Sequence, residues 1–426
     1  MKKLFFYVVT VAAMMGCSSS NEPGEDERVI DMLPKTRAIV LTQEQKSFVN
    51  KTTDFSFNLF RTISQRSGGK KSSVLSPISV TYVMGMLNDG AAGNTAKEIT
   101  SVLGFGENDT KAVNEFCKKL IEEAPLTDPS VTLEIANTVI ANSHRDIRFE
   151  SKYLNDMKDY YSAAVESYDF GNKAEALQEI NGWCNDRTHG MIPEILDENE
   201  LEADALLLLM NAIYFKATWT DKFDSKDTRN ETFTTEAGQQ KSLPMMHRKA
   251  QARCGQNDVF TMLNLPYGSG DKWAMRILLP KEGKTVDDVI NSLNKESWQE
   301  LWSDGWNPVV DILVPRFSTQ FETDLVEPLS AMGAPSMFDS NKAEFPHISS
   351  NFKEIYVGLM KQKAAIEVNE EGTKASAVTV AMLGETMNVE YEKPMNIDFH
   401  CDHPFVYVIQ EASSGVIFFL GSYRGE

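Results

Sequence analysis

The sequence is poor in the residues on which most enzymes, metalloproteins and nucleic-acid-binding proteins depend. Its 426 residues include only five cysteines and six histidines, with no C-x-x-C pair and no zinc-ligand spacing. The formal net charge of −19 and the lack of a basic stripe argue against nucleic acid as a partner. The chain also lacks a G-x-S-x-G elbow, an H-E-x-x-H helix, a P-loop and a G-x-G-x-x-G turn. We therefore expect no catalytic site, no cofactor and no metal.

The cysteines are too scattered to indicate a disulfide framework. Four of them lie downstream of the N-terminal region: Cys117, Cys184, Cys254 and Cys401. In a large chain such cysteines are most often small buried apolar residues, and a disulfide is the alternative in an exported protein. His400 and His403 flank one of them, but they would face opposite sides of a strand. These two histidines are therefore not expected to bind one metal ion together.

The N-terminus carries the clearest targeting signal. Two lysines precede an apolar run over residues 4–15, which is too short to span a membrane. With the small Gly16 before Cys17, this pattern predicts a signal peptide over residues 1–16. The segment resembles a bacterial lipobox, which implies acylation of Cys17. The alternative is an ordinary secreted protein with an incidental cysteine.

Serine and acidic residues dominate residues 18–27. That composition buries too little apolar surface to fold, so we predict a flexible acidic tether over residues 17–41. Acidic residues soon after a lipid-bearing cysteine resemble the export signal of surface lipoproteins in Gram-negative bacteria, and Ser18 fits outer-membrane sorting. The expected location is therefore the outer membrane or the cell surface, with the membrane contacted through Cys17.

From Thr42 onward, helix-like patterns come first and strand-like patterns later. Apolar residues recur on one helix face over residues 44–66, and Ser76-Pro77 is typical of a helix start, with serine as the cap. Residues 206–215 are almost continuously apolar, as in a strand buried on both faces. One later helix is expected over residues 286–301, and a strand over residues 357–368. This order predicts a single α+β domain.

One stretch does not fit an ordinary fold. After a convincing strand, residues 373–381 alternate so that every second residue is small. Such a strand could enter a crowded sheet interior with its small side chains inward and Lys374 pointing to solvent. The alternative is an edge strand followed by a long loop.

Five separated motifs resemble segments of the serpin family, and they occur in the family's order. They are Ser76-Pro77-Ile78-Ser79, Asn211 to Trp219, Val314-Pro315-Arg316-Phe317, Glu370-Glu371-Gly372-Thr373 and Phe399 to Phe405. The first is similar to the shutter segment beneath the central sheet, and the second to an internal strand that ends at a tryptophan. The third resembles the strand that faces the base of the reactive loop. The fourth resembles the loop hinge of inhibitory members, and the fifth resembles the C-terminal signature.

The resemblance implies a serpin domain over residues 42–426. The expected fold is α+β, with a large central mixed sheet, two further sheets, about nine helices and a reactive loop that is exposed or inserted. The implied function is inhibition of a serine protease, or sometimes a cysteine protease, which cleaves the loop and is trapped as an acyl-enzyme when the loop inserts into the central sheet. The protein is then an inhibitor rather than an enzyme, and we expect a monomer.

The resemblance also assigns site residues. The reactive bond falls at Thr386-Met387, and a shift by one residue either way stays open. The loop hinge comprises Glu370, Gly372, Thr373, Ala375, Ser376, Ala377 and Val378. The sheet-opening region comprises Ser76, Ser79, Asn211, Trp219, Arg316 and Gln362. Threonine or methionine at the cut favours an elastase-like or subtilisin-like target, and no basic residue lies between Lys374 and Lys393 to suit a trypsin-like one.

Two positions depart from the family pattern. Gln362 stands where many relatives carry a histidine, although its amide can still exchange hydrogen bonds with Ser79 or Asn211. Lys374 stands where many inhibitory members have an acid, but its side chain would point outward.

The resemblance further implies that Arg316 and Glu370 lie close together at the base of the loop. Two other functions stay open: a serpin-shaped binding protein that never inserts its loop, and a hydrolase.

Overall fold

Helices predominate over strands in the first half of the chain and strands over helices in the second half in the structure, a computed structural model that describes residues 35–68, 71–106, 109–270, 272–373 and 395–425. Residues from Thr36 onward form one compact unit. The described residues contain nine α-helices and three sheets. This confirms the predicted α+β class, the two further sheets and the helix number.

Some of the helices begin at a residue whose side chain caps them, and others begin without a side-chain cap. They are α1 Gln43–Arg66, α2 Pro77–Gly90, α3 Gly93–Leu103, α4 Thr110–Glu123, α5 Ser151–Tyr161, α6 Lys173–Arg187, α7 Val286–Ser292, α8 Lys295–Ser303 and α9 Val326–Met332. Thr42 starts α1 with a capping box, in which its hydroxyl accepts from the Gln45 amide at 3.1 Å and its own amide donates to the Gln45 side chain at 3.1 Å.

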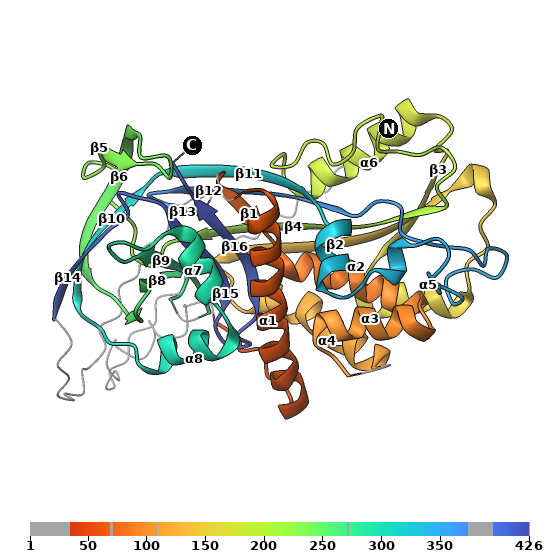
Figure 1. The fold of residues 1–426 in the computed structure, drawn as a ribbon, viewed down its shortest axis with the longest axis horizontal. Coiled ribbons are helices and arrows are strands. Elements are labelled where there is room, and N and C mark those ends of the chain that lie inside the picture. The colour runs from red at the N-terminus through yellow and green to blue at the C-terminus, as the bar shows by residue number, and fades with distance from the viewer. Residues whose placement is uncertain (1–34, 69–70, 107–108, 271, 374–394, 426) are drawn as a thin grey trace, which may run out of the picture. The chain divides into compact units, whose positions relative to one another are not determined.

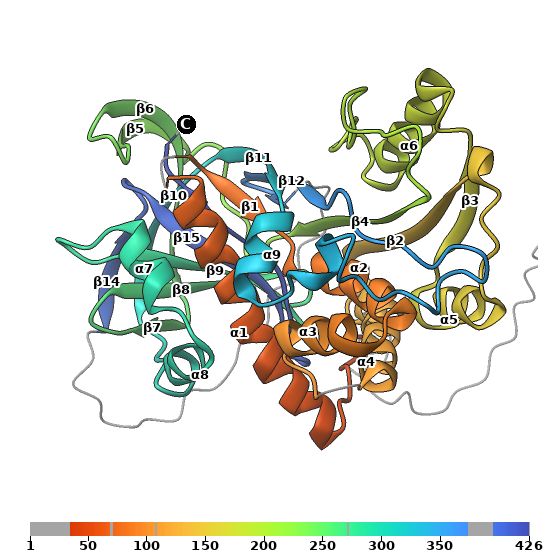
Figure 2. The ribbon, with the colours of Figure 1, turned by 45° about the vertical axis from the view of Figure 1, so that its right-hand side comes forward.

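The central sheet is mixed and has six strands. In spatial order they are β11 Phe317–Asp324, β12 Lys361–Asn369, β13 Gly372–Thr373, β4 Leu207–Thr218, β2 Val131–Asn142 and β3 Ala164–Tyr168. Helices α2 to α5 lie on one side of this sheet and α6 on the other, as Figures 1 and 2 show. Consecutive side chains of β2 point to opposite faces of the sheet. Val139 therefore packs in the main core, while Ile140 packs in a smaller core beneath α6.

The other two sheets pack at the opposite end of the unit from α6 (Figure 2). One has the order β1 Ser73–Leu75, β16 Ile417–Tyr423, β15 Phe405–Glu411, β9 Trp273–Pro280, β8 Phe260–Tyr267 and β7 Cys254–Gln256. The other has the order β14 Asn396–His400, β10 Val309–Pro315, β6 Gln240–Gln251 and β5 Arg229–Thr234. Every residue of β15 and β16 is buried, so these two strands form the centre of the main core.

Three expectations about elements are wrong in detail. The helix predicted over residues 286–301 is two helices, because Leu293 is extended and Asn294 caps α8 by accepting from the Ser297 amide at 2.9 Å. The strand predicted over residues 357–368 begins only at Lys361. The Ser76 side chain precedes α2 but makes no capping hydrogen bond to it.

The domain core starts slightly before Thr42. Ile39 and Leu41, which the predicted tether includes, are buried, and the Ile39 amide donates to the Ser413 hydroxyl at 2.9 Å. No helix within the described ranges is long and apolar enough to cross a membrane. The four described cysteines are buried with free thiols, as the first of the two alternatives expected.

Candidate functional site

A gap divides the central sheet between β12 and β4. The short strand β13 fills only one end of it, where Thr373 pairs with Val368 on one side and with Ala217 on the other. Beyond Thr373, no strand of the described ranges pairs with the facing edges of β12 and β4. Both strands run antiparallel to β13, so they are parallel to each other, and a cavity of about 960 Å³ lies along them. The gap therefore continues the path of β13.

The cavity is lined by residues of both strands. The lining includes consecutive residues of both strands, and those on the face toward the main core are Gln362, Ala364 and Ile366 from β12, and Asn211, Ile213 and Phe215 from β4. The first five residues of β4 are only half-buried. The expectation that this apolar strand is buried on both faces is thus wrong, because one of its edges borders the cavity instead of another strand.

Polar contacts hold the hinge at the end of the gap. Arg316 Nε lies 2.7 Å from both carboxylate oxygens of Glu370, and the Thr228 hydroxyl donates to the same carboxylate at 2.5 Å. The predicted closeness of Arg316 and Glu370 is confirmed. Burial alone raises the pKa of Glu370, but the hydrogen bonds from Arg316 and then Thr228 outweigh it, so the pKa lies below its usual value.

Trp219 fastens the backbone on either side of Glu370. Its indole nitrogen donates to the Asn369 carbonyl at 2.9 Å, and its amide donates to the Glu371 carbonyl at 2.9 Å. The indole stacks on Tyr267, with ring centroids 4.4 Å apart. The Tyr267 hydroxyl lies 2.7 Å from that of Thr373, which is the last described residue before the loop. The hinge is therefore fixed by both backbone and side-chain contacts.

The sheet-opening residues divide between the two sides of the gap. Gln362 accepts from the Ser76 amide at 3.0 Å and donates to the Ser76 carbonyl at 2.8 Å, while the Ser79 hydroxyl donates to that of Ser76 at 3.0 Å. Asn211 lies across the gap and donates to Asn137 at 2.9 Å. The expected contact of Gln362 with Ser79 or Asn211 is wrong. Its side-chain amide instead bonds to both the backbone N–H and the backbone C=O of Ser76, directly before α2.

Several site residues were missed or lie outside the description. Ala375, Ser376, Ala377, Val378, Thr386, Met387 and Cys17 fall outside the described residues. Tyr267 and Thr228, both of which contact the hinge, were not predicted. Neither belongs to a motif, and their role depends on chain segments that meet only in the folded protein.

Comparison with known proteins places this geometry in context. The family model "Serpin (serine protease inhibitor)" matches residues 50–424. Human glia-derived nexin is 31% identical over 358 residues, covering 82% of this chain and 86% of the relative. A serpin-like protein of Thermococcus kodakarensis is 33% identical over 392 residues, covering 91% and 88%.

Solved structures agree in fold. Native protease nexin-1 with heparin aligns with a TM-score of 0.76 at 28% identity, covering 90% of this chain and all 100% of that one. Human thyroxine-binding globulin with its hormone aligns with a TM-score of 0.78 at 27% identity, covering 89% and 98%. Native tengpin, a thermophilic serpin, has a TM-score of 0.78 at 23% identity, covering 91% and 95%, which supports the fold alone.

The backbone at Gly372 leads to a first prediction. Its φ of +141° is a conformation that other residues rarely adopt, and an added Cβ would lie 2.2 Å from the Ala217 carbonyl oxygen. Gly372→Ala should therefore lower the free energy of unfolding by about 1–3 kcal/mol, measured by urea denaturation. Gly358→Ala is the control, because its Cβ would meet only the Tyr356 ring at 3.8 Å. Equal stability of Gly372→Ala and the wild type would contradict the constraint.

The ion pair at the hinge leads to a second prediction. Because the pKa of Glu370 is lowered in the folded state, its stabilisation is present above its ordinary pKa of 4.5 and is lost as the pH falls through the lowered value. The stability difference between the wild type and Glu370→Gln should therefore shrink as the pH falls from 6 toward roughly 3, measured as urea midpoints across this range. Arg316→Gln should show the same convergence. A difference that stays constant with pH would contradict the role of the pair.

Proposed function

Because the chain belongs to the serpin family, we propose that it inhibits serine or cysteine proteases by suicide cleavage of the segment that follows Thr373. The protease's nucleophilic oxygen or sulfur bonds to the carbonyl carbon of Thr386, the Thr386–Met387 peptide bond breaks, and the amine of Met387 leaves with a proton. The cleaved segment then enters the central sheet as a new strand and carries the acylated protease with it. The observation that carries this proposal is the unfilled space between β12 and β4, which continues the path of the hinge.

The register of β13 predicts where an inserted strand would lie. Each step of two residues beyond Thr373 moves two residues back along both β12 and β4. The resulting neighbours are Ile366 and Phe215 for Ala375, Ala364 and Ile213 for Ala377, and Gln362 and Asn211 for Thr379. The arriving side chains that face inward are small, and this suits positions beside large side chains such as Phe215, Ile366 and Ile213.

One polar group supports this register. Asn211 Oδ1 is buried and has no hydrogen-bond partner within the described ranges. Leaving such an acceptor unsatisfied costs about 1–3 kcal/mol. In the proposed register the hydroxyl of Thr379 arrives beside it and can donate. Insertion would then pair a group that is unpaired before it.

We further propose an elastase-like or subtilisin-like target. This rests on Thr386 or Met387 at the cleaved bond and on the lack of arginine and lysine between Lys374 and Lys393. An SDS-resistant complex with such a protease would support it. The same complex with trypsin alone would contradict the choice of target but not the mechanism.

A pair of substitutions tests insertion directly. Ala377→Glu should turn the inhibitor into a substrate, because the arriving strand would bury an unpaired carboxylate on the inner face of the sheet. Val378→Glu is the matched control, since the next residue along a strand faces outward. On a denaturing gel, the control and the wild type should give a covalent complex with an elastase-like protease. Ala377→Glu should give mostly cleaved inhibitor and active protease.

Three outcomes of that experiment are informative. Equal trapping by both variants would rule out insertion in this register. Loss of trapping by both would indicate that the region tolerates no carboxylate on either face. If the wild type itself forms no complex, the chain is better explained as a serpin-shaped binding protein.

Attachment to a membrane is a separate proposal. We infer from the N-terminal sequence that Cys17 is acylated and that the protein is exported to the outer membrane or cell surface. Expressed in a Gram-negative host, the wild type should incorporate a fatty-acid analogue and Cys17→Ala should not. Equal labelling of both would exclude this cysteine as the acylated residue.

A further inference from the structure

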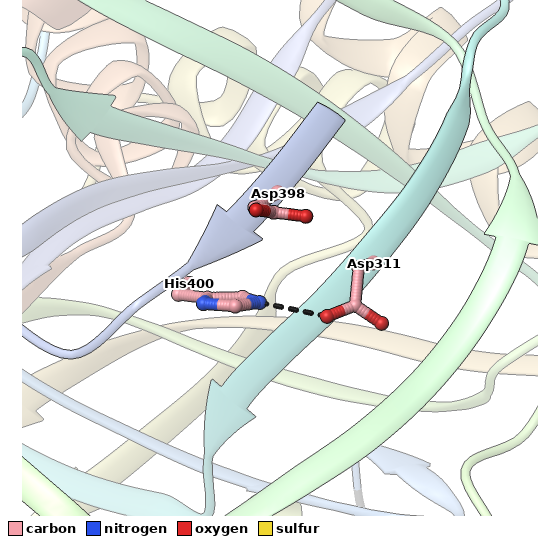
Figure 3. Close-up of side chains that lie close together, drawn as sticks. All are labelled: Asp311, Asp398 and His400. Atoms are coloured by element: carbon pink, nitrogen blue, oxygen red, sulfur yellow. Dashed lines mark hydrogen bonds and ion pairs between the residues drawn. The ribbon is translucent and has the colours of Figure 1, made fainter. Parts of the chain in front are cut away.

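Two histidines and two aspartates that do not belong to the hinge meet on the four-stranded sheet. Asp311 lies on β10, His247 on the neighbouring β6, and Asp398 and His400 on the edge strand β14. Figure 3 shows Asp311, Asp398 and His400 converging from two adjacent strands. Only six histidines occur in the chain, and two of them contact one carboxylate here.

Strand register explains why these side chains converge. Asp311 is paired with Asp398 across the parallel β10–β14 ladder, so the two carboxylates lie on the same face. Leu313 is paired with His400 on one side and with His247 on the other, two residues further along β10. Both imidazoles therefore flank the same leucine and reach back to Asp311.

Both oxygens of Asp311 are engaged by imidazoles. His400 Nε2 lies 2.9 Å from Oδ2, and His247 Nε2 lies 2.9 Å from Oδ1. A nitrogen or oxygen atom of each of Asp311, Asp398 and His400 lies within 4.8 Å of the other two. The Asp311 side chain is 29% exposed and that of His400 38%, so the group is partly covered but open to solvent.

Hydrogen bonds between histidine and aspartate account for only part of this arrangement. The Asp398 side chain has neither a hydrogen bond nor an ion pair with any residue that the structure describes, although it lies directly opposite another carboxylate. Like charges in that position are destabilising. Lys249 is paired with Asp311 from the β6 side. The two aspartates and this one lysine together still carry a net negative charge. A cation between the two carboxylates would remove this repulsion.

We propose that Asp311, Asp398 and His400 bind a divalent transition-metal ion of the zinc type. Imidazole nitrogen with carboxylate oxygen is a ligand set that suits Zn²⁺, and three protein ligands leave one position of a tetrahedral site for water. His247 is then a positioning residue, because it holds the second oxygen of Asp311 and orients the carboxylate. The absence of metal was expected from the spacing of His400 and His403. That argument considered one strand and did not include the aspartates that neighbouring strands supply.

Such an ion would link the edge strand to its neighbour. Strand β14 is the first described element after residues 374–394, and among the described strands it pairs only with β10. Two of the proposed ligands come from β14 and one from β10. Bound metal would therefore add a cross-link between β14 and β10, the one strand that pairs with β14 in the described part of the chain.

Asp398→Asn tests this site with little risk to folding. The substitution replaces the charged carboxylate of Asp398 with a neutral amide. It leaves both histidine contacts of Asp311 in place. Asp402→Asn is the matched control, because Asp402 is also an exposed aspartate beside a histidine, with His403 Nδ1 at 2.7 Å, but it lies outside the described strands and so is not paired with a carboxylate in any described ladder. The full-length chain is purified without a polyhistidine tag and titrated with Zn²⁺ in a calorimeter.

The wild type and Asp402→Asn should bind one Zn²⁺ per chain. Asp398→Asn should bind it at least about tenfold more weakly, since even residues that only orient ligands change affinity by that factor. Zinc should also raise the thermal midpoint of the wild type but not that of Asp398→Asn. Without zinc, Asp398→Asn should be as stable as the wild type or more stable, which excludes misfolding as the cause. No one-to-one binding by the wild type, or equal binding by Asp398→Asn, would overturn the proposal.

Discussion

The central constraint on this fold is a sheet whose two middle strands are held apart by a strand of only two residues. Backbone N–H and C=O groups along the facing edges of β12 and β4 have no strand partner there within the described ranges. Such groups must bond to water instead. The sheet is therefore incompletely paired in its middle, where a sheet is normally most stable. The centre of the main core lies elsewhere, in the fully buried strands β15 and β16.

Hydrogen bonds fix the two ends of the gap between β12 and β4. At one end the hinge is attached by Trp219, Thr228 and Arg316, all of which bond to residues 369–371. At the other end Gln362 attaches β12 to Ser76, the residue directly before α2. Most of these contacts are polar and directional, so they fix positions more than they add buried apolar area. An arriving strand could widen the sheet without first exposing a large hydrophobic surface.

The sequence predicted the elements better than the contacts between them. The long periodic segment of α1 was located to within one residue, because amphipathic patterns are local. The pairing of Arg316 with Glu370 followed from the family resemblance. The convergence of Asp311 on His247 and His400 could not be predicted, since it depends on the register of three strands brought together from distant parts of the chain. The half-burial of β4 was also hidden, because an apolar strand beside a cavity has the same composition as one beside another strand.

The glutamine at position 362 has a consequence for how the sheet responds to its surroundings. Its amide satisfies the amide and carbonyl of Ser76 at once, and it carries no proton that can be gained or lost in the physiological range. A histidine in the same place would change its charge near pH 6.5, and would then be able to donate but not accept. The hydrogen bonds between Gln362 and Ser76 are therefore the same in neutral and mildly acidic surroundings, so acidification does not by itself break this contact between β12 and the start of α2.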